Sequence, residues 1–116
     1  MARYIRSSWK KTDKKSLDPK LTQQVFSTGS IMLVRYVYEP GLNFPEHSHP
    51  QEQVTMVEEG KLEFEIDGEK VILNEGDICA IGPNIPHSTR VGKERVIAIS
   101  IFTPVKEDII IKPKSG

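Results

Sequence analysis

KLEFEIDGEKVIL, residues 61–73, is the stretch that decides the fold of this 116-residue chain. Apolar and acidic residues alternate strictly from Leu62 to Ile66, which predicts a β-strand with one buried face. Asp67-Gly68 then predicts a tight turn, because the two central residues of such a hairpin turn adopt positive φ angles. The apolar run that follows is expected to return as a second strand. This stretch therefore predicts a β-hairpin that places one face in a core.

Strand patterns continue on both sides of this hairpin. Residues 31–38 are rich in β-branched and aromatic side chains, and the Glu-Pro-Gly sequence at 39–41 ends them. Residues 78–81 form a short apolar run, and residues 95–103 form a further strand. No segment has a long helical period, although residues 16–24 could form one helical turn. Many short strands separated by turn signals predict an all-β sandwich or barrel.

Length and composition are those of one globular domain. The chain has 16 basic and 16 acidic residues, a formal net charge of zero and 37% hydrophobic residues, so no nucleic-acid partner is expected. The basic residues before position 12 are interpreted as a solvated arm, and Trp9 within it suggests that the arm docks. We expect residues 1–29 to form an N-terminal arm and the first strand or strands, docked on a barrel formed by residues 30–116.

Signals for export or membrane insertion are not evident. Residues 1–13 are polar and charged, and no apolar run approaches the roughly 20 residues that cross a bilayer. Cys79 is the only cysteine, and its apolar neighbours predict a buried structural thiol. These features predict a cytoplasmic protein without a membrane partner.

The three histidines of the chain are the clearest chemical signal. His47 and His49 are two residues apart, so on a strand both side chains point to the same face. Gln53 has the same parity as His49 if the strand continues, and His87 follows a rigid Pro-Asn-Ile-Pro segment that could bring it back against the pair. Imidazole suits Zn, Ni, Cu and Fe, and a carboxamide oxygen can complete such a site. Taken singly, each of these residue types is more often an ordinary surface or core residue than a metal ligand. Whether they form a metal site therefore depends on the sequence motifs around them.

The framework around the first two histidines resembles the cupin superfamily. The first motif of that superfamily is glycine, five residues, His-x-His, three or four residues, glutamate, six residues and glycine. The sequence from Gly41 to Gly60 matches this motif at every spacing, with Gln53 in the position of the glutamate. Glu52 would be the ligand instead only if a bulge reversed the parity of the strand.

The second cupin motif is found around His87. The motif is glycine, five residues, Pro-x-Gly, two residues, histidine, three residues and asparagine, and the sequence from Gly76 keeps the spacing. Gly82, Asn84 and Val91 are the departures, and asparagine tolerates the left-handed backbone that glycine would supply. The resemblance covers residues 30–103 and implies a single-domain double-stranded β-helix, the cupin or jelly-roll barrel.

The metal site that this resemblance implies holds one divalent transition metal through His47, His49, Gln53 and His87. The ligand chemistry permits Ni, Zn, Fe, Mn or Cu. Because all four ligands are neutral, the charge of the ion would be uncompensated. The site should therefore attract a small anionic or oxygen-rich ligand and act as a Lewis acid.

A glutamine at this position is similar to one subgroup, the pectin-degradation cupins that linearise unsaturated uronates. HSHPQEQ at 47–53 and IFTPVKED at 101–108 resemble that subgroup. Its members open a 4,5-unsaturated monouronate to a 5-keto-4-deoxyuronate, using an aspartate, a phenylalanine and an arginine near the metal. The resemblance makes the corresponding residues the candidate catalytic residues: Ser100, Phe102 and Lys106.

Two of these three positions differ from the subgroup, because Ser100 replaces the aspartate and Lys106 the arginine. Several functions are therefore compatible with the sequence. Serine cannot replace the carboxylate acid–base group, and lysine keeps the charge of arginine without its bidentate fork. The first hypothesis is a metal-dependent isomerase or lyase-like enzyme that acts on a small sugar acid, with Lys106 holding its anionic group. A metal-dependent dioxygenase and a non-catalytic ligand-binding module are the alternatives. The family resemblance also implies a homodimer, to which the apolar run at 109–111 could contribute.

Overall fold

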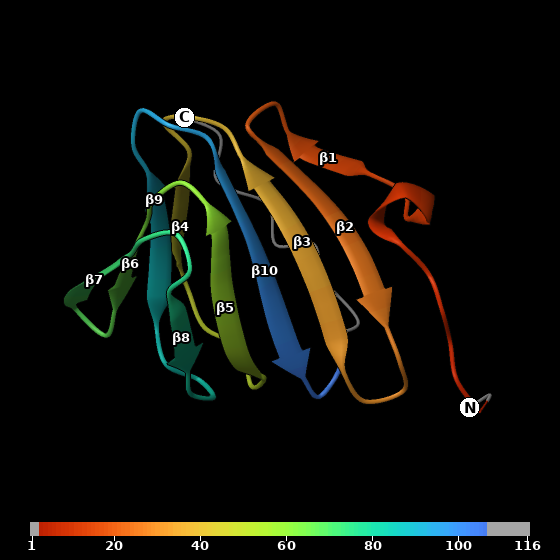
Figure 1. Cartoon of the computed structure of the whole chain (residues 1–116). Coiled ribbons are helices and arrows are strands. Elements are labelled where there is room, and N and C mark those ends of the chain that lie inside the picture. Colours follow the sequence, from red (N-terminus) through yellow and green to blue (C-terminus); the bar gives the residue numbers. More distant parts are fainter. Residues whose placement is uncertain (1–2, 107–116) are drawn as a thin grey trace.

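The computed structural model describes residues 3–106 of the chain. The regular secondary structure of this part is β-strand apart from one 3-10 turn near the N-terminus (Figure 1). None of its helices is long and apolar enough to cross a membrane. The elements in chain order are η1 (Trp9–Lys11), β1 (Lys15–Asp18), β2 (Leu21–Ser27), β3 (Met32–Tyr38), β4 (Asn43–His47), β5 (Glu52–Glu59), β6 (Leu62–Ile66), β7 (Glu69–Leu73), β8 (Ile78–Ile81), β9 (His87–Val91) and β10 (Val96–Thr103).

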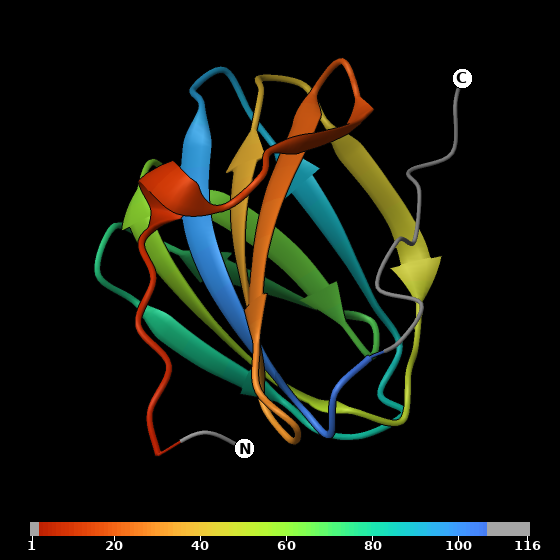
Figure 2. The ribbon, with the colours of Figure 1, turned by 90° about the vertical axis from the view of Figure 1, so that its right-hand side faces the viewer.

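Two antiparallel sheets face each other across the core (Figure 2). The larger sheet has the strand order β1-β2-β3-β10-β5-β8, and the smaller has the order β4-β9-β6-β7. From β3 onward the chain passes back and forth between the sheets, because β5, β8 and β10 lie in one and β4, β6, β7 and β9 in the other. This is the jelly-roll topology of a double-stranded β-helix, and it confirms the all-β fold predicted from the sequence.

The hairpin at residues 61–73 forms as its sequence predicts. β6 pairs with β7 from Leu62 opposite Leu73 to Ile66 opposite Glu69. Asp67 and Gly68 adopt φ angles of 50° and 84°, as the two-residue turn requires.

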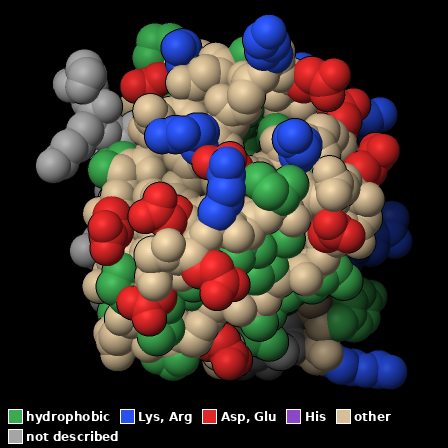
Figure 3. Space-filling model, turned by 90° about the vertical axis from the view of Figure 1, so that its left-hand side faces the viewer, with side chains coloured by type: hydrophobic (Ala, Val, Ile, Leu, Met, Phe, Trp, Pro, Cys, Tyr) green, Lys and Arg blue, Asp and Glu red, His purple; other side chains and the backbone are tan. Residues whose placement is uncertain are grey.

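Alternation along the strands separates the core from the surface. The buried apolar core between the sheets contains Leu21, Tyr38, Leu42, Val57, Leu62, Phe64, Leu73, Ile81, Val91, Val96 and Ala98. On the outer face of β6, Glu63 forms ion pairs with Lys70 at 3.4 Å and with Arg90 at 3.9 Å. Figure 3 shows side chains of both charges interspersed on this side of the molecule.

The N-terminal segment extends the larger sheet and covers part of its outer face. β2 pairs with β3, and β1 forms the edge next to β2. Before β1, the arm crosses the outside of the sheet (Figure 2), where the Gln24 amide donates to the carbonyl oxygens of Trp9 at 2.6 Å and Thr12 at 2.9 Å. The helical turn predicted within residues 16–24 is wrong. The Asp18 carboxylate accepts the Lys20 N–H at 2.8 Å, which supports a tight turn between two strands.

Cys79 departs from its predicted burial. It is only partly buried, and its neighbour Ile78 is 65% exposed. The reason is position, since β8 is the last strand of its sheet and no further strand covers it. Burial still raises the pKa of the Cys79 thiol, which disfavours the nucleophilic thiolate.

Gly60, which ends the first motif, is expected to be essential for stability. A Cβ atom there would clash with the Arg95 carbonyl oxygen, and the residue has a φ of +85°. Gly68 has nearly the same φ, +84°, with no atom within 4 Å of the added Cβ. Gly68→Ala should therefore lower the free energy of unfolding by about 1–2 kcal/mol, and Gly60→Ala by about 3 kcal/mol or more. Urea unfolding measures both, and equal losses would contradict the role of the close contact.

Candidate metal centre

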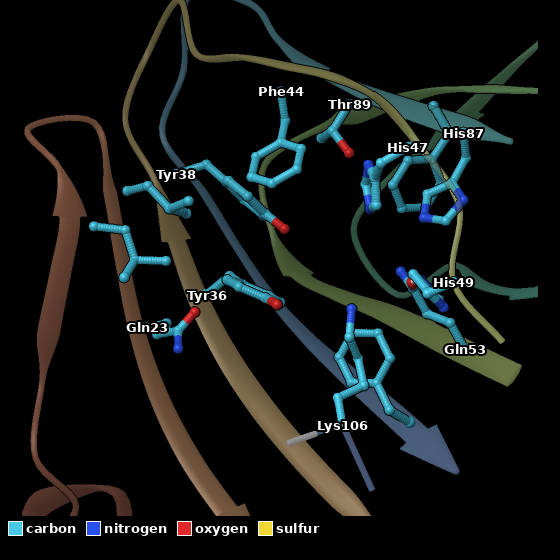
Figure 4. Close-up of a pocket in the computed structure, with 14 residues that line it drawn as sticks. Gln23, Tyr36, Tyr38, Phe44, His47, His49, Gln53, His87, Thr89 and Lys106 are labelled. Atoms are coloured by element: carbon cyan, nitrogen blue, oxygen red, sulfur yellow. The ribbon is translucent and has the colours of Figure 1, made fainter. Parts of the chain in front are cut away.

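All three histidines of the chain meet inside the barrel (Figure 4). His47 is the last residue of β4 and lies opposite His87, the first residue of β9, in the antiparallel pairing of these strands. His49 follows in the loop after β4, and its carbonyl oxygen accepts the Asn84 N–H at 2.8 Å. Asn84 has a φ of 62°, so the left-handed position expected from the second motif is present. One ring nitrogen from each histidine lies within 4.8 Å of the others.

Backbone carbonyl groups orient the three rings in the same way. Each Nδ1 lies at hydrogen-bond distance from the carbonyl oxygen of a residue two positions away along the chain. The distances are 3.1 Å from His47 to Pro45, 3.1 Å from His49 to Gln51 and 2.9 Å from His87 to Ile85. A carbonyl oxygen can only accept, so in His47 and His87 the Nδ1 atom carries the proton and Nε2 keeps its lone pair. His49 has a carbonyl oxygen near each ring nitrogen. This tautomer is the one that binds a metal through Nε2.

Burial keeps the rings neutral. It lowers the pKa of His47 to about 4 and outweighs the hydrogen bond to Pro45, which raises it. Burial also lowers the pKa values of His49 and His87, and the nearby Lys106 ammonium lowers both further. At neutral pH the cluster therefore presents unprotonated nitrogens, the form that a metal requires.

His87 shows most clearly that the cluster is suited to a cation. Its side chain is 2% exposed, and Nε2 is buried without a hydrogen-bond partner in the described part of the chain. An unsatisfied buried polar atom costs about 1–3 kcal/mol. A metal ion bound by the lone pair would remove that cost, so the donor atoms present fit a transition metal.

Gln53 adds an oxygen atom to the three nitrogens. It projects inward from β5 and is 6% exposed, whereas its neighbour Glu52 is exposed. Gln53 Oε1 lies 3.1 Å from His49 Nε2. Either a proton on His49 Nε2 or a cation shared by the two atoms accounts for this contact, because the amide oxygen can only accept. The strand does not continue from His49, because β4 ends at His47 and β5 begins at Glu52. The inward direction of Gln53 comes from the alternation within β5.

A chain of polar side chains holds the Gln53 amide. Gln53 Nε2 donates to Thr55 Oγ1 at 3.0 Å, and Thr55 Oγ1 lies 2.8 Å from Ser100 Oγ. Thr55 and Ser100 are directly opposite each other in the pairing of β5 with β10, and both are fully buried. Ser100 therefore lies behind Gln53, and within the described residues its hydrogen-bond connection to the histidines runs through Thr55 and Gln53.

Phe102 and Lys106 reach the cavity beside the histidines. The Phe102 ring is 5.6 Å from the His49 ring, centroid to centroid, and packs edge to face. Lys106 Nζ lies 5.2 Å from the centroid of the Phe102 ring. Of the three residues aligned with catalytic positions, two line the cavity and Ser100 does not.

Further residues that the sequence did not single out for this site line the same cavity. Gln23, Tyr36 and Tyr38 form its wall opposite the histidines (Figure 4). Their inward direction follows from the register of β2 and β3, which pairs Gln23 with Tyr36. The free volume of the cavity is about 40 Å³, enough for a metal ion with a few water molecules.

Fold and site together define a small jelly-roll barrel with a histidine cluster inside one end. A sequence model of the cupin domain family matches residues 34–102. The chain therefore belongs to the cupin family. No curated protein matches the sequence.

Solved structures agree with this assignment. An RmlC-like cupin from Shewanella frigidimarina NCIMB 400 is 26% identical with a TM-score of 0.83, and the match covers 90% of this chain and 94% of the other. KdgF from a Halomonas species is 24% identical with a TM-score of 0.78, covering 84% and 91% of the two chains. AerE from Microcystis aeruginosa is 24% identical with a TM-score of 0.76, covering 82% and 46%. The last two likenesses show the fold.

Replacing Gln53 should weaken metal binding, whereas replacing its exposed neighbour should not. Gln53→Ala removes the oxygen that faces His49, and we expect the affinity for Ni²⁺ or Zn²⁺ to fall by at least about tenfold. Glu52→Ala is the matched control and should bind as the wild type does. A competition titration against a chromophoric chelator measures both affinities. A loss confined to Glu52→Ala would instead identify the carboxylate as the ligand.

Proposed function

We propose that this protein is a metal-dependent cupin that binds a small sugar acid, with the metal acting as a Lewis acid on the bound ligand. The observation that carries the proposal is the convergence of three neutral imidazoles and one amide oxygen at a buried point, with the Lys106 ammonium beside it. A cation held by neutral ligands, next to a second cation, favours an anionic ligand with oxygen donors.

The proposed metal ligands are His47, His49, Gln53 and His87. Imidazole and carboxamide donors suit Ni, Zn, Fe, Mn or Cu, and the relative affinities of these metals do not select one in a cell. The ion would polarise an oxygen atom of the ligand. The ion would also bind the lone pair of His87 Nε2, which has no hydrogen-bond partner in the described residues.

Lys106 and Phe102 would hold the ligand next to the metal. The ammonium group of Lys106 provides the positive charge for a carboxylate, and the Phe102 ring forms an apolar wall that excludes water from this contact. Lys106 lies three residues beyond the end of β10, outside any strand pairing. Because the cavity is small, the ligand proposed is a monosaccharide acid and not an oligosaccharide.

Ser100 would act by positioning Gln53. Its hydroxyl contacts the Thr55 hydroxyl, which in turn accepts a hydrogen bond from the Gln53 amide. Such outer contacts fix the orientation of a metal ligand. Ser100 is therefore proposed as a positioning residue, in contrast to the acid–base residue that occupies the aligned position in the uronate-linearising subgroup.

One observation favours ligand binding without turnover as a second candidate. No aspartate or glutamate lines the cavity within the described residues, so a carboxylate proton carrier is missing there. Burial raises the pKa values of both Tyr36 and Tyr38, which makes the phenols poor bases at neutral pH. Isomerisation would have to use Lys106 or a metal-bound group, whereas binding needs neither.

A cytoplasmic location and a homodimeric assembly are also proposed for this protein. The only cysteine is a free thiol, which accords with the reducing cytoplasm. A homodimer is proposed on the family resemblance, and the run at 109–111 suggested for it lies outside the described residues.

Removing the Lys106 charge should separate acid binding from metal binding. In the nickel-loaded protein, Lys106→Met should weaken binding of D-galacturonate by at least about tenfold, or 1.4 kcal/mol, with unchanged nickel content. Lys93→Met, at an exposed turn, is the matched control and should bind as the wild type does. Isothermal titration calorimetry measures the affinities, and loss of alkene absorbance from a 4,5-unsaturated monouronate measures turnover. A nickel-loaded wild type that binds no sugar acid would contradict the proposal.

A further inference from the structure

Gln23 is a buried side chain whose polar atoms have no hydrogen-bond partner among the described residues. It projects inward from β2 and is 1% exposed, and neither Nε2 nor Oε1 has a hydrogen bond in the described part of the chain. Gln24, the next residue, projects outward and uses its whole amide. It donates to the Trp9 and Thr12 carbonyl oxygens and accepts from Arg35 at 3.2 Å. The sequence thus places one fully satisfied glutamine beside one that is entirely unsatisfied.

The unsatisfied amide belongs to a polar wall of the cavity. Gln23 lies opposite Tyr36 in the pairing of β2 with β3, and the rings of Tyr36 and Tyr38 stack with centroids 5.4 Å apart. The hydrogen bonds of the described residues include none for either phenol oxygen. In Figure 4 both hydroxyl groups point into the space between Gln23 and the histidines. Three polar groups that form no hydrogen bond within residues 3–106 therefore line the side of the cavity away from the proposed metal.

We propose that Gln23, together with the Tyr36 and Tyr38 hydroxyls, binds hydroxyl groups of the ligand at the end away from the metal. This assignment rests on the proposed function and adds to it the orientation of the ligand. An amide offers both donors and an acceptor, and so does a phenol. Their complement is a group that donates and accepts, which is a hydroxyl.

A carboxylate is the wrong partner for this wall. It can only accept, so it would leave Gln23 Oε1 buried and unpaired. The ammonium of Lys106 and the proposed metal lie elsewhere in the cavity and match a carboxylate. The ligand is therefore a polyhydroxylated monocarboxylic acid with its carboxylate near Lys106 and its hydroxyl groups toward Gln23. A site built to hydrogen-bond hydroxyls rejects analogues that lack them, because its polar groups are then left unpaired.

Two ring acids test this assignment in the nickel-loaded full chain. D-galacturonate carries hydroxyls, whereas cyclohexanecarboxylate has a six-membered ring and a carboxylate without them. Wild type should prefer D-galacturonate by at least about 100-fold. Gln23→Met keeps the side-chain length and removes the amide. It should reduce this preference at least about tenfold, with nickel content and cyclohexanecarboxylate affinity unchanged. Gln24→Met, the same substitution on the opposite face, should leave the preference unchanged.

The Tm of the ligand-free protein distinguishes a ligand-binding Gln23 from one that stabilises the fold, because the two roles predict opposite changes for Gln23→Met. Gln23→Met removes an unsatisfied amide, so the Tm of the ligand-free protein should rise by about 3 °C or more. Gln24→Met breaks three hydrogen bonds and should lower it. A fall in Tm for Gln23→Met, or an unchanged preference, would overturn the assignment. If the wild type binds both acids equally, the role assigned to Gln23 is wrong but the proposed function stands. If the wild type binds neither acid, the proposed function is wrong as well.

Discussion

Hydrogen bonds from three imidazole Nδ1 atoms to nearby backbone carbonyls determine what this barrel can do. Each acceptor is two residues from its histidine, so the orientation of each ring is set locally in the chain. The pairing of β4 with β9 then brings His47 and His87 together, and the Asn84 contact holds the loop that carries His49. The result is a set of neutral nitrogens facing one buried point, where an atom without a hydrogen-bond donor or a cation costs stability.

The inner face of the larger sheet lines both ends of the cavity, with hydrogen-bonded polar side chains at one end and polar side chains without hydrogen bonds in the described residues at the other. On β5 and β10, Gln53, Thr55 and Ser100 satisfy one another and hold an oxygen atom toward the histidines. On β2 and β3, Gln23 and Tyr36 leave their polar groups open to the cavity. A satisfied network is rigid, whereas an unsatisfied one lowers stability until a ligand arrives. This difference accords with a preorganised end for the proposed metal and a second end whose polar groups await the proposed ligand, a compromise between stability and function.

Much of the fold and part of the candidate site were predictable from the sequence. Strict alternation and an Asp-Gly turn predict the hairpin at 61–73, and motif spacing places the histidines close together. The wall at Gln23 and Tyr36 was missed, because LTQQV in β2 does not alternate and its inner face emerges only from pairing with β3. The helical turn within 16–24 was wrong because sheet pairing overrides weak local preference. The contact of Ser100 with Thr55 depends on cross-strand register, which spacing along one chain does not give.

Metal content of tag-free protein purified without chelators tests most directly whether the histidine cluster holds an ion. Inductively coupled plasma mass spectrometry of the wild type and of His49→Ala provides the comparison. One equivalent of a divalent transition metal in the wild type, lost in the variant with the fold retained, is the result predicted here. Folded wild-type protein that carries no metal, and takes up none when offered Ni²⁺, Zn²⁺, Mn²⁺ or Fe²⁺, would contradict the account.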